Sequence, residues 1–281
     1  MGLTKRAGTA VILASAAVLT AGAPAPAAVT IGQVAPPEGV ATNCPGSATD
    51  VLQPSVTAGA NLYVAKQAGT ITSWSTRAAV GPGQTYTLKV FRRTTDPDVF
   101  RAIGHSGPHT LSSGVNTFPA GVPVSSGDLL GLNVSGSPNA CTFDVPGDSV
   151  LVRTGNLADA ASGTFGPQPD SRLNLSAVLV PTNAFSFIDL IRDRRTGTAT
   201  LEIQLSNPGA VTLSGKGLKT RRSTKTIAVA STVKFGIAAA GARKKKLNRR
   251  GRVSVRLVAT FTPTGGDPAT QVINLILKKK R

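Results

Sequence analysis

The chain of 281 residues is long enough for two domains of ordinary size. Its 30 glycines and 19 prolines, together with only 4% aromatic residues, argue against a helical protein and favour an all-β protein with many turns and mostly aliphatic cores. The net charge of +18 is typical of a protein that meets nucleic acid or another polyanion, and its distribution along the chain narrows this choice.

The positive charge is concentrated in the second half of the chain. Between residues 28 and 180, eight Lys and Arg residues stand against nine Asp and Glu residues, a net charge of −1. Between residues 181 and 281, twenty-one stand against four, a net charge of +17. The sequence therefore predicts a nearly neutral part followed by a strongly basic one.

The N-terminus has the pattern of a secretory signal peptide. Lys5 and Arg6 precede an apolar run over residues 7–19, and Ala25-Pro26-Ala27 is a small-x-small cleavage site. A single membrane anchor is the alternative, but the run is shorter than the roughly 20 residues of a span, and no later segment is apolar enough. We therefore expect residues 1–27 to be removed and the mature protein to be secreted, either free outside the cell or associated with the cell wall.

Secretion gives the two cysteines, Cys44 and Cys141, a simple interpretation. In an oxidising compartment the only two cysteines of a chain are expected to form a disulfide bond. The bond would close a loop of about a hundred residues, for which the chain-entropy model gives roughly 4–5 kcal/mol of stabilisation. Two thiols alone make a poor metal site, and we expect neither a metal nor any other cofactor.

Residues 28–182 show the rhythm of an antiparallel β-sandwich. Short apolar or alternating segments are separated by clusters of Gly, Pro and Asp, which favour turns. The expected strands lie at residues 61–64, 69–76, 85–92, 122–124, 128–134, 149–152 and 173–179. Many short strands with turns at this spacing predict a jelly-roll-like sandwich, tied by the disulfide bond.

Residues 183–281, which follow a short junction at residues 181–184, predict a second sandwich. The clearest alternation is in residues 197–205, where Ala199, Leu201 and Ile203 point to one face. The expected strands lie at residues 185–191, 197–205, 210–213, 226–230, 231–237, 252–261 and 271–277. Seven short strands in about a hundred residues are typical of an immunoglobulin-like sandwich.

A dense run of cations separates the fifth of these strands from the sixth. We expect a loop, with Leu247 inserted into the end of the sandwich and its charged neighbours in solvent, and no helix after the signal peptide. The cations are Arg243, Lys244, Lys245, Lys246, Arg249 and Arg250, followed by Arg252 at the start of the next strand. A part with this charge binds polyanions at low salt, because binding releases counterions.

Both parts resemble modules of secreted proteins. The second resembles the C-terminal immunoglobulin-like modules of secreted actinobacterial proteins, through its basic loop and the segments GTATL (197–201), NPG (207–209), LSGKG (213–217) and TPTGG (262–266). The first resembles, more loosely, secreted jelly-roll modules of the carbohydrate-binding type, through GTITSW (69–74) and VSSGD (124–128). These resemblances imply extracellular binding or structural modules and bring no catalytic residues with them.

Trp74, the only tryptophan, is the candidate platform for a sugar ring, with Tyr63 and Tyr86 as weaker candidates. Strict alternation places Ile71 and Trp74 on opposite faces of their strand, so Trp74 is exposed if Ile71 is buried and no bulge intervenes. The alternative is a tryptophan buried in the core or between the sheets.

The other candidates for chemistry are weaker. His105 and His109 lie in a Gly- and Pro-containing segment that cannot form the helix of a His-x3-His metal site, so we expect a solvated loop there. Ser106 lacks the Gly-x-Ser-x-Gly surroundings of a hydrolase nucleophile. Asp96 and Asp98 are weak candidates for a Ca²⁺ site, with a simple turn as the alternative. A hydrolase would need two carboxylates that face each other, or His105 beside a carboxylate.

We therefore expect a secreted, non-enzymatic binding or surface protein. Its basic part would hold it to anionic cell-wall or envelope polymers, and its first part is a candidate for binding polysaccharide. The alternatives are a structural or adhesive protein, a charge that serves only solubility, and a polysaccharide-active enzyme such as a glycoside hydrolase. Nucleic acid is disfavoured as a partner, because the basic loops contain no aromatic residues on which bases could stack.

Overall fold

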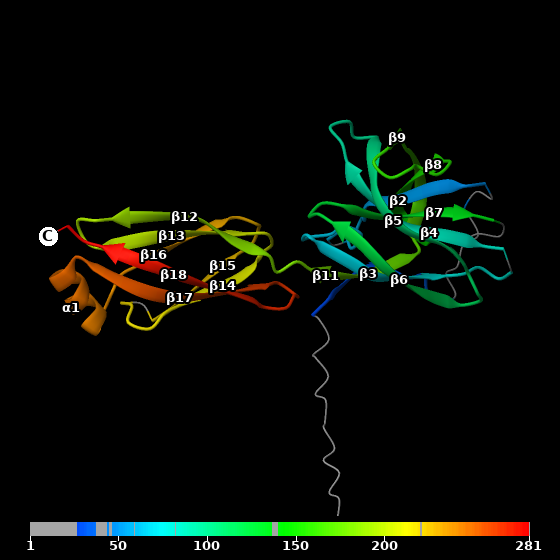
Figure 1. The fold of residues 1–281 in the computed structure, drawn as a ribbon. Helices are drawn as coiled ribbons and strands as arrows, with labels where there is room; N and C mark the ends of the chain where they lie inside the picture. The colour runs from blue at the N-terminus through cyan, green and yellow to red at the C-terminus, as the bar shows by residue number, and fades with distance from the viewer. Residues whose placement is uncertain are drawn as a thin grey trace, which may run out of the picture.

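The computed structural model describes residues 27–37, 44, 47–58, 60–81, 83–136, 140–219 and 221–280. The predicted signal peptide lies outside these residues, except for Ala27. In the described part of the chain, four antiparallel sheets form two lobes that lie end to end (Figure 1). The prediction of an all-β protein built from antiparallel sheets is confirmed. Among the described helices, none is long and apolar enough to cross a membrane.

The first lobe packs two sheets against each other. One sheet has the strand order β1-β11-β3-β6, and the other has the order β10-β8-β2-β7-β4-β5-β9. Their strands are β1 (Val29–Gln33), β2 (Thr49–Ser55), β3 (Gly69–Arg77), β4 (Thr85–Arg93), β5 (Val99–Thr110), β6 (Val115–Val124), β7 (Leu129–Ser135), β8 (Thr142–Thr154), β9 (Ser162–Thr164), β10 (Gly166–Leu173) and β11 (Leu175–Pro181). Aliphatic side chains from both sheets form the core between them, and each buried Leu, Ile or Val contributes about 1.5–3 kcal/mol.

The second lobe is a smaller pair of sheets with its own core. The strand orders are β12-β13-β16 and β15-β14-β17-β18. Their strands are β12 (Phe185–Asp193), β13 (Thr198–Leu205), β14 (Gly209–Ser214), β15 (Arg222–Ile227), β16 (Thr232–Ile237), β17 (Arg252–Pro263) and β18 (Ala269–Lys278). Six of the seven expected strands lie where they were predicted, whereas the strand expected at residues 226–230 is displaced toward the N-terminus and forms β15. Ala199, Leu201 and Ile203 are buried in the core, as their alternation predicts.

The first lobe departs further from expectation. The segment at 61–64 is no strand, because only Val64 forms an isolated bridge, to Leu129. β1, β2, β5, β9 and β10 were not expected, and β5 runs through a segment that contains Gly107 and Pro108. Two irregularities in the β4–β5 register, between Tyr86 and Leu88 and between Val90 and Phe91, let this strand continue past its turn-forming residues.

The expectation of a basic loop without a helix is wrong, because α1 (Gly241–Arg250) forms there. Arg, Lys and Leu are strong helix formers, and a cationic surface helix needs only a few apolar contacts to be held in place. α1 ends at Gly251, which adopts the left-handed conformation and donates its N–H to the carbonyl of Leu247. The cations of the last turn, Arg249 and Arg250, also interact favourably with the helix dipole.

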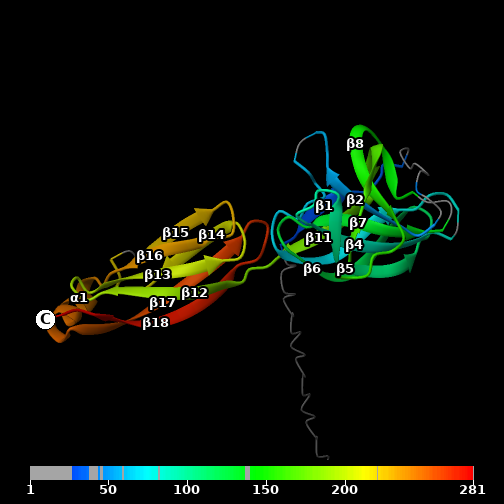
Figure 2. The same cartoon turned by 90° about the horizontal axis from the view of Figure 1, so that it is seen from above.

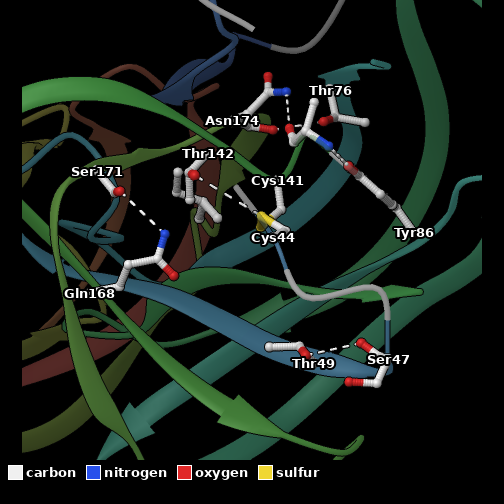
Figure 3. The surroundings of a disulfide bond; sticks show 12 residues. Cys44, Ser47, Thr49, Thr76, Tyr86, Cys141, Thr142, Gln168, Ser171 and Asn174 are labelled. Atoms are coloured by element: carbon white, nitrogen blue, oxygen red, sulfur yellow. Dashed lines mark hydrogen bonds between the residues drawn. A yellow bond between two sulfur atoms is a disulfide. The ribbon is translucent and has the colours of Figure 1, made fainter. Parts of the chain in front are cut away.

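The predicted disulfide bond between Cys44 and Cys141 is confirmed (Figure 3), and their Cα atoms lie 5.9 Å apart. Cys141 is buried beside a network centred on the fully buried side chain of Asn174. The Asn174 amide donates to the carbonyl of Arg77 and its oxygen accepts from the N–H of Ala35, both at close range (2.8 and 2.9 Å). The disulfide bond therefore fastens Cys44 to a hydrogen-bonded part of the core.

Figure 2 shows the two lobes from a second direction. Side-chain hydrogen bonds from Asn207 and Gln67, which we call the polar clasp, join them. The buried Asn207 side chain accepts from the N–H of Ala68 at 2.8 Å and donates to the carbonyls of Ala68 and Thr182 at 2.8 and 2.7 Å. Gln67 adds a hydrogen bond to the carbonyl of Thr264 at 2.9 Å. These bonds connect the buried side chains of Asn207 and Gln67 to partly buried backbone groups, so bending at the junction would leave the buried amides unpaired.

Candidate functional site

The second lobe gathers its cations at the end that faces away from the first lobe, which we call the basic end. β12, β14, β16 and β18 run toward this end and β13, β15 and β17 run back, so the connections between them on this side meet there. Figure 1 shows α1 and the C-terminus together at this end. The described cations of the basic end are Arg192, Arg194, Arg195, Lys216, Lys219, Arg221, Arg222, Arg243, Lys244, Lys245, Lys246, Arg249, Arg250, Arg252, Lys278, Lys279 and Lys280.

α1 presents part of this charge from a fixed position. Leu247 is 3% exposed and belongs to the core of the second lobe, so its predicted insertion into the end of the sandwich is confirmed. Arg243 donates to the carbonyl of Ser254 at 2.7 Å, which ties the helix to β17. The cations of α1 that are exposed to solvent are Lys244, Lys245, Lys246, Arg249 and Arg250.

Little negative charge faces the basic end. Asp193 is the last residue of β12, and its carboxylate accepts hydrogen bonds from two residues of the following turn, from the Thr196 hydroxyl at 2.7 Å and from the Arg195 N–H at 2.8 Å. These hydrogen bonds lower the pKa of Asp193 and commit its carboxylate to the turn. Among the described residues, the ion pair of the second lobe is Lys234–Glu202, which lies along the strands. The charge of the basic end is therefore available to a partner.

Two hollows open between the connections at the basic end. The larger, of about 930 Å³, lies beside the start of α1 and is bordered by Lys216, Arg221, Arg243 and Arg256. The smaller, of about 250 Å³, lies beside the end of α1 and is bordered by cations and one glycine. The described residues that line them include no Asp or Glu. Both hollows are suited to anionic groups.

The first lobe does not present the expected aromatic platform. Trp74 is fully buried and packs against Phe118, with ring centroids 4.9 Å apart. Ile71 is buried as well, because a bulge between Ile71 and Ser73 in the pairing of β3 with β6 shifts the alternation. The bulge therefore turns Trp74 into the core, where it cannot stack on a sugar.

Tyr63 and Tyr86 are also fully buried and serve the fold. The Tyr63 hydroxyl donates to the carbonyl of Leu173 at 2.6 Å, and the Tyr86 hydroxyl accepts from the N–H of Ala140 at 2.7 Å. Burial raises the pKa of both phenols above the ordinary value. None of the three aromatic candidates is therefore a ligand platform.

His105 and His109 lie in β5, where the sequence favoured a solvated loop. His105 Nδ1 lies 2.8 Å from a carboxylate oxygen of Asp159, which meets one of the geometric conditions for a hydrolase. His109 instead stacks on Phe118, with ring centroids 4.2 Å apart. Ser106 donates its hydroxyl to the carbonyl of Pro119, so it makes no hydrogen bond to His105. The structure thus separates the two histidines and leaves His105 without a nucleophile among its described hydrogen-bond partners.

Asp96 and Asp98 form the simple turn that was the alternative to a Ca²⁺ site. The Asp98 N–H donates to the carboxylate of Asp96 at 3.1 Å, which is the hydrogen bond of an Asx turn. Among the described residues, no group of three or more His, Cys, Asp or Glu side chains is close enough to hold a metal ion.

A polar cleft lies on the outer face of the seven-stranded sheet. It has a volume of about 540 Å³ and is covered on one side by residues 156–159. Its floor is formed by Thr85, Thr87 and Lys89 of β4, His105 of β5, and Asn133 and Ser135 of β7. Lys89 lies directly opposite His105 in the β4–β5 ladder and donates its ammonium to the carbonyl of Leu157 at 2.5 Å. The same sheet face is apolar farther along, where Phe91, Phe100 and Phe165 form a small cluster.

Asp50 holds residues 156–159, which cover the cleft, in place through a hydrogen bond to Leu157. Its buried carboxylate accepts hydrogen bonds from the Leu157 N–H and from the Asn133 amide, both at 2.8 Å. Burial raises the pKa of Asp50, while these hydrogen bonds and the charges of Lys89 and Arg153 act in the opposite direction. Sequence reasoning missed this cleft, although Lys89 between the buried residues Leu88 and Val90 was a visible signal.

Searches found no protein-family model and no curated protein that matches the chain.

Proposed function

We propose that the protein is a non-enzymatic binding protein of the cell exterior that holds on to anionic envelope or cell-wall polymers through its basic end. The observation that supports this most strongly is the collection of cations from separate connections at one end of the sandwich, where the carboxylate of Asp193 is held by hydrogen bonds within its own turn. A charge that served only solubility would have no reason to gather on one side.

A polymer is a better partner for this surface than a small ion. The exposed cations spread over α1, the neighbouring turns and the end of β18, so a flexible chain can contact many of them at once and release many counterions. The aromatic residues of the second lobe (Phe185, Phe187, Phe235 and Phe261) all lie on strands, away from the connections of the basic end. The surface therefore suits a polymer without bases to stack.

The test uses the chain from residue 28 to residue 281 and polygalacturonate as a defined polyanion, over a salt series. The triple variant Lys244→Gln, Lys245→Gln, Lys246→Gln should lower the slope of log affinity against log salt by about two units. A charge-matched control neutralises Lys66, Lys225 and Lys234, which lie elsewhere on the surface, and should keep the slope. Failure of the unmodified protein to bind at low salt would refute the proposal.

The polar cleft supports a second candidate function, the binding of polysaccharide by the first lobe. With Trp74 buried, the cleft replaces it as the place for a sugar, because Thr87, Asn133 and Asn156 offer hydroxyl and amide groups that match sugar hydroxyls. The presence of a cleft also favours a binding protein over a purely structural one. Asn156 is exposed, so Asn156→Ala should weaken glycan binding without unfolding the protein, and unchanged binding would argue against this site.

A further inference from the structure

Six cations of the basic end surround the smaller hollow, of about 250 Å³. They come from three segments: the β12–β13 turn, the junction of α1 with β17, and the end of β18. The residues that line the hollow are Arg194, Arg250, Gly251, Arg252, Lys278, Lys279 and Lys280.

Backbone hydrogen bonds hold the three segments together. The Lys279 N–H donates to the carbonyl of Gly251 at 2.8 Å, and the Lys280 N–H donates to the carbonyl of Arg194 at 2.6 Å. The Lys279 ammonium also donates to the side chain of Asn248 at 3.0 Å, which draws it toward α1. The main chain therefore fixes the spacing of the cations before any ligand arrives, which lowers the entropic cost of binding.

The arrangement is unfavourable without an anion. Arg252 and Lys278 lie directly opposite each other in the β17–β18 ladder, and like charges in this position destabilise a sheet. No acidic residue lines the hollow, and the carboxylate of Asp193 is held by its own turn. An anion between the three segments would relieve this repulsion.

We propose that the hollow binds the phosphate group of a phosphodiester-linked polyol polymer, an inference that rests on the proposed function of the basic end. A phosphodiester group is tetrahedral and its oxygens can accept hydrogen bonds from several directions, whereas one guanidinium fork satisfies a planar carboxylate. The guanidinium groups of Arg194, Arg250 and Arg252 approach from two segments, with lysines on the third. The basic end offers no described aromatic side chain, which favours a polyol over a nucleic acid.

The experiment compares three variants of the 28–281 chain. The hollow variant carries Arg194→Gln, Arg250→Gln and Arg252→Gln. The matched control carries Arg195→Gln, Lys219→Gln and Arg222→Gln, which removes the same charge from the same end outside both hollows. A third variant replaces the three arginines of the hollow by lysine, which keeps the charge but removes the paired N–H donors of the guanidinium groups. All six substituted side chains are exposed, and circular dichroism checks that each variant is folded.

Binding is measured by calorimetry at 150 mM salt, with poly(glycerol phosphate), polygalacturonate and single-stranded DNA as probes. For poly(glycerol phosphate), we expect about a tenfold weaker affinity in the hollow variant than in the matched control, and a several-fold loss in the lysine variant. For polygalacturonate, the hollow variant and the control should bind equally.

The other outcomes separate this inference from the proposed function. Equal losses in the hollow variant and the control for every probe would overturn the phosphate site and leave a diffuse basic surface. Tighter binding of DNA than of poly(glycerol phosphate) by the unmodified protein would overturn the polyol assignment. No binding of any probe at any salt concentration would overturn both the site and the proposed function.

Discussion

The substitution Leu247→Ala tests whether the basic helix depends on a single anchor. Leu247 is the buried residue of α1, and its side chain also lies against the buried Gly197 of the β12–β13 turn. Truncation of a buried leucine to alanine costs about 2–5 kcal/mol. Because Leu247 lies at the end of the sandwich, where neighbours can move into the vacated space, we expect about 2–3 kcal/mol.

The expected loss is large enough to measure by differential scanning calorimetry of the 28–281 chain. For a domain of about 100 residues, 2–3 kcal/mol corresponds to a decrease of about 10–20 °C in the melting temperature of the second lobe. Lys246→Ala is the control, since this neighbouring side chain is exposed and alanine favours the helix. Equal melting temperatures for Leu247→Ala and Lys246→Ala would refute the idea that Leu247 holds the helix on the sandwich.

Three further predictions concern the rest of the molecule. Asn207→Ala should lower the free energy that holds the two lobes together by about 1–3 kcal/mol, and ¹⁵N relaxation should then show the lobes tumbling separately. Unchanged joint tumbling would show that the lobes stay together without these hydrogen bonds. Replacement of Cys44 and Cys141 by serine should lower the unfolding free energy in urea by roughly 4–5 kcal/mol, and no loss would contradict the chain-entropy account. Burial would raise the pKa of Asp148, but hydrogen bonds from Arg172 and Thr57 outweigh it and lower the pKa below 3.8. The lowered pKa of Asp148 stabilises the folded protein at every pH above 3.8, the ordinary pKa of an aspartate, and this stabilisation is lost as the pH falls below 3.8. In urea unfolding measured across pH, the free energy of unfolding of Asp148→Asn should therefore fall less steeply in acid than that of the unmodified protein.

The sequence was a good guide to the second lobe and a poorer one to the first. Six of the seven strands of the second lobe were predicted at their places, and the clearest of them, β13 and β17, alternate between buried and half-buried or exposed residues. β15 was expected at residues 226–230 but lies at Arg222–Ile227, because it has no buried face whose alternation could be recognised. In the first lobe, β5 contains Gly107 and Pro108, and its register adapts to them through tertiary pairing that no local pattern reveals. The bulge in β3 likewise could not be predicted from a local pattern. It shifts the alternation by one residue, so that Trp74 and the residues after it point to the opposite face of the sheet from the one expected.

The candidate sites could be predicted only in part, for a related reason. The cations of α1 form one run in the sequence, so their charge was evident, although the helix was not. The hollow beside α1 needs Arg194 and Lys280, which the antiparallel order of the strands brings together. Likewise, His105 and its partner Asp159 are 54 residues apart. Sites built from one segment are visible in a sequence, whereas sites built from several depend on topology.

The positions of the two candidate sites also bear on how they would work together. β7 begins at Leu129, which bridges to Val64 near the second lobe, and ends at Ser135, which lines the polar cleft. Val64 shares a hollow with Pro208 of the second lobe, so the cleft lies toward the opposite side of the first lobe. If the basic end is held by an anionic polymer, the clasp at Asn207 keeps the cleft pointing away from that polymer. An anchored molecule would then offer its cleft to the surroundings, and loosening the clasp would remove this orientation without affecting either site.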